Sequence, residues 1–164
     1  MIKTVVAILM MMAFAASAQA ESVLLTLPFG VVLGKPISKK SLRYATPHYD
    51  AFYEFQRGWY ADKGKGGILN KMYTYNDEDK EAPALPKKWR NIGLKLCDKG
   101  GNGSSRNQIK TIMRREGGVS VWGKKDDRVY YDLADRYRFI FEFKDGSSCL
   151  TGIHVDLKVT STEF

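Results

Sequence analysis

Side chains that could carry out catalysis are few in this chain of 164 residues, and they are scattered along it. The two histidines, His48 and His154, are far apart, and no G-x-S-x-G motif of a serine hydrolase accompanies them. Zinc would need more ligands than two distant histidines provide. Carboxylate pairs such as Asp132 with Asp135 could serve a glycosidase only at a separation that the fold would have to set. We therefore expect no catalytic residues, no metal site and no cofactor, and we keep a small envelope hydrolase with an unrecognised site as the alternative.

The N-terminal segment has the three regions of a secretory signal peptide. Lys3 supplies a positive charge, residues 5–16 form an apolar run, and Ala18-Gln19-Ala20 makes a small-x-small cleavage site. The apolar run is too short for an ordinary membrane span. We therefore expect a signal peptide at residues 1–20 and a single domain at residues 21–164. The location should be periplasmic or secreted, with no transmembrane segment after processing.

Cys97 and Cys149 are the only cysteines. In an oxidising compartment a single pair is best interpreted as one disulfide. A free catalytic thiol is the alternative, but neither cysteine has a histidine nearby in the sequence to activate it. We therefore predict a Cys97–Cys149 disulfide, for which the loop-closure argument gives a stabilisation of about 4 kcal/mol.

The chain is basic, with 26 Lys and Arg against 18 Asp and Glu and a formal net charge of +8. In an exported protein such a charge favours anionic partners and also keeps the protein soluble. Nucleic acid does not suit the expected compartment. The partner that we expect is another envelope protein or an anionic envelope component.

Aromatic side chains are densest between residues 44 and 60. Residues 52–56 fit a strand, which we favour, although Thr46-Pro47 could also begin a helix. The aromatic segment can either pack in the core or form a binding platform for a sugar or a partner protein. The candidate partner-binding residues in and just after it are Tyr49, Tyr53, Trp59, Tyr60, Lys63 and Lys65.

The clearest periodicity lies between residues 136 and 159 and predicts a β-hairpin. Aromatic residues occupy every second position of the first arm, which places them on one face of a sheet, and the second arm alternates in the same way. Asp145-Gly146 supplies the residues of a tight turn between the arms. The four aromatic residues are Tyr137, Phe139, Phe141 and Phe143.

One helix is predicted at residues 106–116. Ser105 and Gln108 have capping-box spacing, apolar residues follow at helical intervals, and Gly117-Gly118 ends the element. Further strands are predicted at residues 29–33 and 92–97. Together these elements predict an α+β domain, with an antiparallel sheet of about four to six strands, one or two helices packed on one face, and a single disulfide.

Three features resemble a known group of proteins: the opening at residues 28–34, the capped helix ending in Gly117-Gly118, and the closing hairpin through Asp145-Gly146. Their order resembles small exported α+β proteins with the architecture of outer-membrane-assembly lipoproteins or of β-lactamase-inhibitor proteins. The resemblance covers about half of the mature chain. It implies a helical layer on an antiparallel sheet and a role in binding another protein without catalysis. The chain differs from the lipoproteins because the residue directly after the cleavage site is Glu21 and not a cysteine.

The function that we expect is therefore non-catalytic binding in the periplasm. The protein would act as an inhibitor, an immunity-type protein or an envelope accessory factor. Binding would use a basic surface that contains aromatic residues.

Overall fold

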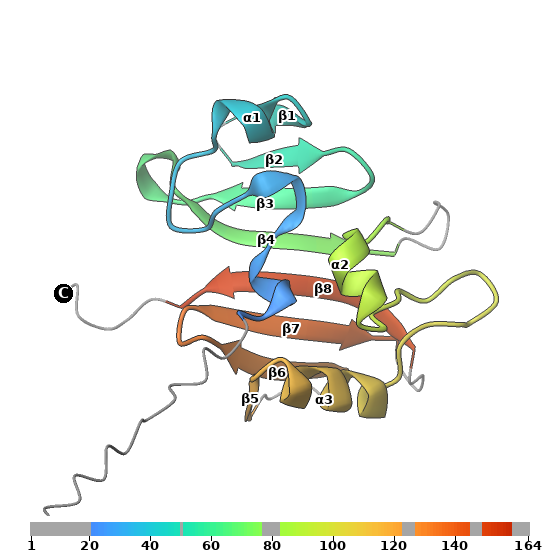
Figure 1. The fold of residues 1–164 in the computed structure, drawn as a ribbon. Coiled ribbons are helices and arrows are strands. Elements are labelled where there is room, and N and C mark those ends of the chain that lie inside the picture. The colour runs from blue at the N-terminus through green and yellow to red at the C-terminus, as the bar shows by residue number, and fades with distance from the viewer. Residues whose placement is uncertain (1–20, 50, 77–82, 123–126, 145–148, 159–164) are drawn as a thin grey trace, which may run out of the picture.

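The computed structural model describes residues 21–49, 51–76, 83–122, 127–144 and 149–158. These residues form one eight-stranded antiparallel sheet with the order β1-β2-β3-β4-β8-β7-β6-β5 (Figure 1). The expected signal peptide and the turn expected at Asp145-Gly146 lie outside the described residues. The strands are β1 (Ala45–His48), β2 (Phe52–Phe55), β3 (Trp59–Lys63), β4 (Leu69–Tyr75), β5 (Val119–Val121), β6 (Arg128–Leu133), β7 (Tyr137–Phe143) and β8 (Leu150–Leu157).

The strand order is symmetric about the central pair of β4 and β8. Each half of the sheet is a four-stranded meander that follows a helix, α1 (Lys39–Leu42) before β1 and α3 (Arg106–Arg115) before β5. The β2–β3 and β6–β7 turns also match in length, because Phe55 pairs with Trp59 and Leu133 with Tyr137. The described chain is thus built as two similar halves joined along β4 and β8.

The predicted α+β class with four to six strands is wrong. Among the described residues, only α3 is a helix of more than five residues; α1 and α2 (Lys87–Asn91) are short. Instead of a helical layer, irregular chain covers much of the sheet, including the 3₁₀ turns η1 (Val23–Leu25) and η2 (Pro28–Gly30). The strand count is higher than predicted because the aromatic segment and the residues after it supply four strands of their own.

The predicted hairpin, helix and disulfide are confirmed. In the hairpin, β7 and β8 pair with Phe139 opposite Val155 and Phe141 opposite Ile153, so the aromatic residues share a face. Helix α3 begins at Ser105 with the capping box formed. Residues 52–55 form a strand, and Cys97 is bonded to Cys149.

Two predicted strands are wrong. Residues 28–30 form η2, in which Phe29 has a left-handed φ of 56° that no strand contains. Leu94 and Leu96 are both buried, as alternation predicted, but this segment belongs to no ladder. Its backbone bonds mainly outside the sheet: Ser104 N–H donates to the Lys95 carbonyl oxygen, and Cys97 N–H donates to the carbonyl oxygen of Leu150 at the start of β8.

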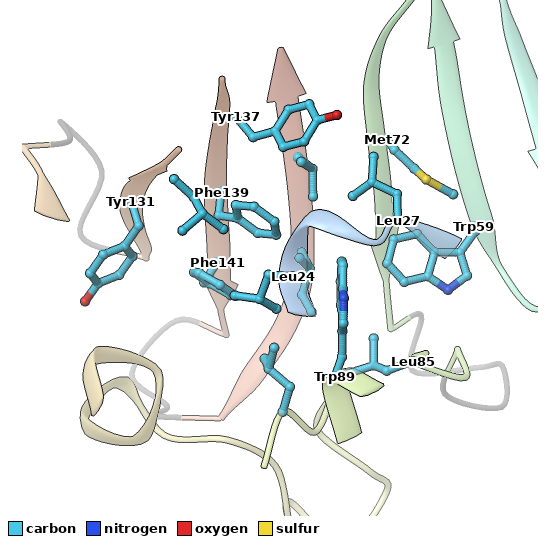
Figure 2. Packing of buried hydrophobic residues seen from close by; sticks show 14 of the residues in the cluster. Leu24, Leu27, Trp59, Met72, Leu85, Trp89, Tyr131, Tyr137, Phe139 and Phe141 are labelled. Carbon is cyan, nitrogen blue, oxygen red and sulfur yellow. The ribbon is translucent and has the colours of Figure 1, made fainter. Parts of the chain in front are cut away.

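The core lies on one face of the sheet, beneath α2, α3 and the N-terminal segment (Figures 1 and 2). Trp89 of α2 is fully buried and packs against both halves of the sheet. Its ring centroid is 5.8 Å from that of Trp59 on β3 and 6.0 Å from that of Phe139 on β7. Leu24 of η1 is buried in the same cluster, so the N-terminal segment helps to close the core.

Candidate functional site

The opposite face of the sheet, called the open face here, has no described helix packed on it. Its side chains are those that alternate with the core residues along each strand. On β7, for example, Phe139 and Phe141 point into the core, so Arg138 and Glu142 lie on the open face. Most side chains on the open face are half-buried by their neighbours, and a partner could still reach them.

Aromatic rings cross the open face in a continuous line over five adjacent strands. We call this line the aromatic row. Neighbouring ring centroids lie 4.8 to 6.2 Å apart, the range in which aromatic pairs attract one another. The row consists of His48 on β1, Phe52 on β2, Tyr60 on β3, Tyr73 and Tyr75 on β4, and His154 on β8.

Most rings in the row stack on one another. The interplanar angle is 21° between Tyr60 and Tyr73, 10° between Tyr60 and Tyr75, and 12° between Tyr73 and His154. Tyr73 therefore has a stacked ring on each side, from Tyr60 on β3 and His154 on β8, whereas Tyr60 is stacked on its β4 side and meets Phe52 at an interplanar angle of 61°. At the centre of the row, the accessible parts of Tyr73 are therefore its edge and hydroxyl group and not its ring faces.

An ionic cluster lies at the β8 end of the row. The Nε2 atom of His154 is 3.1 Å from Oε2 of Glu142, and Arg128 also forms an ion pair with Glu142. This close contact with His154 is the main cause that holds the pKa of Glu142 below its ordinary value of 4.5, against the opposing effect of burial. Gly152 makes room for this arrangement, because a Cβ at that position would lie 2.8 Å from Oε2 of Glu142.

Burial shifts the pKa of two further groups on the open face, Tyr73 in the row and Asp156 beside it. It is the largest cause that raises the pKa of Tyr73 to about 12, with smaller effects from the charge and hydrogen bond of Asp62. The Tyr73 hydroxyl is therefore protonated at neutral pH and can donate. Burial also raises the pKa of Asp156, against the opposing charge of Lys71.

A second ionic cluster continues the open face toward β6. The Nε atom of Arg138 is 2.8 Å from Oδ1 of Asp132, and Nζ of Lys158 is 2.9 Å from Oδ2 of the same carboxylate. The hydrogen bond from Arg138 is the largest cause that lowers the pKa of Asp132. Cations and carboxylates are thus closely balanced on the open face, although the whole chain is strongly basic.

The structure distributes the predicted binding residues over different surfaces. Tyr60 lies in the aromatic row, and Tyr49 is 95% exposed beyond the end of β1. Lys63 places its ammonium 4.4 Å from the ring centre of Tyr53, which packs against the core, and Lys65 is exposed in the turn after β3.

Trp59 must be removed from the predicted binding residues. It is fully buried and its Nε1–H donates to the Ala84 carbonyl oxygen at 3.1 Å. Its position explains the error, because it alternates with Tyr60 along β3 and therefore points to the opposite face of the sheet.

Several residues of the open face were not predicted from sequence. Tyr73 and Tyr75 follow a period of two along β4, which is a signal that sequence reading could have used. The pairing of β4 with β8, which brings Tyr73 next to His154, joins residues far apart in the chain and leaves no local pattern. The row therefore depends on the tertiary fold.

The two histidines share the open face but do not converge. Three strands separate β1 from β8, which corresponds to about 19 Å at the usual strand spacing. Within the described residues, no group of three His, Cys, Asp or Glu side chains could hold a metal ion. None of the helices described here is long and apolar enough to cross a membrane.

Comparisons with protein-family models, with curated proteins and with solved structures gave no match to this chain. The candidate site therefore stands on the geometry of the open face alone.

Proposed function

We propose that this protein is a non-catalytic binding protein that holds a partner protein on its open face. The observation that carries the proposal is the aromatic row, which crosses five adjacent strands on a face without a helical cover. Tyrosine is enriched at the centres of protein interfaces because it combines a large apolar ring with a polar hydroxyl. The ionic clusters beside the row would then set the orientation of the partner.

The packing of the rings favours a protein over a sugar or a nucleic-acid base. Recognition of bases by stacking needs an aromatic face that the ligand can cover. In the row, Tyr60 and His154 already stack on the two sides of Tyr73, and Tyr73 stacks on one side of Tyr60. Edges and hydroxyl groups suit a polypeptide, which offers both apolar side chains and backbone hydrogen-bonding groups.

The expected export and the resemblance to exported inhibitor-type proteins support the same proposal. Both lead to a binding protein in the periplasm, with an inhibitor, an immunity-type protein or an envelope accessory factor as the possible roles. The aromatic row defines where binding would occur, and the partner we propose is another envelope protein.

The proposal can be tested with two matched tyrosine variants. Tyr75 on the open face is 45% exposed, and Tyr44, which packs beside Phe29 away from the open face, is 41% exposed. We expect Tyr75→Ala to weaken capture of the partner from a membrane-free envelope extract by about thirtyfold, the effect of an interface hot spot. Tyr44→Ala should leave capture unchanged. Quantitative capture at a series of bait concentrations gives both values.

Thermal unfolding of both variants checks that they are folded. Loss of capture with Tyr44→Ala, together with normal capture by Tyr75→Ala, would place the interface on another side of the molecule.

A further inference from the structure

A second surface with a different chemistry lies at residues 32–44, which include α1. This segment contains four cations and no carboxylate. All four cations are exposed, and none forms an ion pair with another described residue. The cations are Lys35, Lys39, Lys40 and Arg43.

The same segment exposes large apolar side chains among its cations. Val32 is 40% exposed, Leu42 is 42% exposed, and Tyr44 is similarly exposed. Single exposed apolar residues are ordinary on protein surfaces. Leu42 and Tyr44 flank Arg43 in the sequence, so exposed apolar and basic side chains are neighbours at the C-terminal end of this segment, which differs from a cationic face that serves only solubility.

Beside this segment lies a hollow of about 350 Å³. Arg43 and Arg57 both line it, and neither is paired with a carboxylate of the described residues. Glu54 also lines the hollow, but its carboxylate is bonded to His48 at 2.8 Å. Two arginines without an ion-pair partner among the described residues therefore line the hollow, and arginine is the side chain best suited to hold a phosphate.

We propose that residues 39–44 and this hollow form a binding surface for membranes that contain anionic phospholipids. Arg43 and Arg57 hold the phosphate of a headgroup. Leu42 enters the boundary between headgroups and acyl chains, and Tyr44 lies at the polar level that tyrosine prefers. The lysines of α1 add the long-range attraction of a basic patch to an anionic surface.

A membrane fits this surface better than a soluble polyanion. A soluble polyanion would use the cations and leave the exposed apolar side chains in water. An anionic bilayer satisfies both, because its surface offers phosphate groups directly above an apolar layer. The proposal is independent of the open face, since none of these side chains belongs to the aromatic row.

The test is co-sedimentation with vesicles of equal parts phosphatidylglycerol and phosphatidylcholine, and with vesicles of phosphatidylcholine alone. We expect binding to the anionic vesicles only. The double variant Arg43→Gln, Arg57→Gln should bind about thirtyfold more weakly, because each cation near a membrane surface contributes about fivefold. The matched control is Lys87→Gln, Lys88→Gln, which removes the same charge from the exposed surface of α2 and should retain most of the binding.

Two further variants separate the possible results. Leu42→Ser should weaken vesicle binding several-fold while leaving the net charge unchanged. Tyr75→Ala should bind vesicles normally, which keeps this proposal distinct from that for the open face. If Arg57→Gln disturbs the turn in which it has a left-handed φ, Arg43→Gln alone should still weaken binding about fivefold.

Three results would overturn the proposal. The first is no binding to the anionic vesicles. The second is equal weakening by the arginine and lysine pairs, which would indicate diffuse attraction. The third is normal binding by Leu42→Ser combined with complete displacement by heparin, which would indicate a soluble polyanion as the partner.

Discussion

At the scale of single residues, the open face holds two carboxylates in opposite states. The close contact with His154 favours the charged form of Glu142 and lowers its pKa. Burial favours the neutral form of Asp156 and raises its pKa, and one oxygen of that carboxylate is buried without a hydrogen-bond partner. The first carboxylate stabilises the fold at neutral pH, and the second reduces its stability.

This difference predicts that replacing each carboxylate by the uncharged amide will change the melting temperature in opposite directions. The fold loses stability as the pH rises through the raised pKa of Asp156, because the charged form is disfavoured in the folded state. Asp156→Asn should therefore raise the melting temperature at neutral pH, and the gain should disappear at acid pH, where Asp156 is itself protonated. Thermal unfolding of wild type and variant across this pH range measures the effect.

Glu142→Gln is the matched comparison. In the wild type, the lowered pKa of Glu142 contributes stability at pH values above the ordinary pKa of 4.5, and this contribution is lost as the pH falls through the lowered pKa. The variant should therefore melt at a lower temperature than wild type at neutral pH, by a margin that shrinks in acid. A lower melting temperature at neutral pH for both variants would contradict the assignment for Asp156.

At the scale of elements, the β7–β8 hairpin sets which side chains reach the open face. Phe141 pairs with Ile153 and is fully buried on the core face, whereas the next residue, Glu142, lies on the open face. A shift of the register by one residue would exchange the two faces.

Phe141→Ala tests this register. Loss of a fully buried aromatic side chain should lower the free energy of unfolding by about 3 to 5 kcal/mol. The control Lys110→Ala, on the exposed side of α3, should change it by about half a kcal/mol or less. Urea unfolding of the two variants gives both values, and similar values for the two would show that the register is different.

The elements that could be predicted from sequence are those whose signals are local. The alternation around Phe139 and the cap at Ser105 involve residues close together in the chain, and both elements formed as expected. The segments around Phe29 and Leu94 have apolar residues in a similar pattern, but neither segment pairs with a neighbour as a strand of the sheet. Their leucines are buried because they cover the sheet, and burial alone does not distinguish a strand from a covering segment.

At the scale of the whole molecule, positive charge and aromatic residues are separated. The α-helices α1, α2 and α3 contain Lys and Arg but no Asp or Glu, whereas the open face balances its cations with carboxylates. The composition predicted a basic protein with many aromatic residues, and we expected from the sequence that both features would share one binding surface. Assigning the basic residues and the aromatic residues to different surfaces required two things that the structure supplies: which side chains alternate to each face of a strand, and the nonlocal pairing of β4 with β8.

The symmetric strand order explains how the open face becomes wide enough for a partner. Each meander alone would present four strands, and their union along β4 and β8 makes one face of eight. Trp89 supports this union from the core side, because it touches Trp59 in one half and Phe139 in the other. The aromatic row crosses from the first half into the second at the same place.

The central claim is that the open face holds the partner, and site-specific photo-crosslinking tests it most directly. A p-benzoylphenylalanine side chain replaces Tyr75 on the open face in one variant and Lys110 on α3 in another, and each is irradiated in the cells that produce the protein. We predict an adduct of one discrete mass from the Tyr75 position and none from the Lys110 position. An adduct from the Lys110 position with none from the Tyr75 position would contradict the claim and place the partner on the helical side of the sheet.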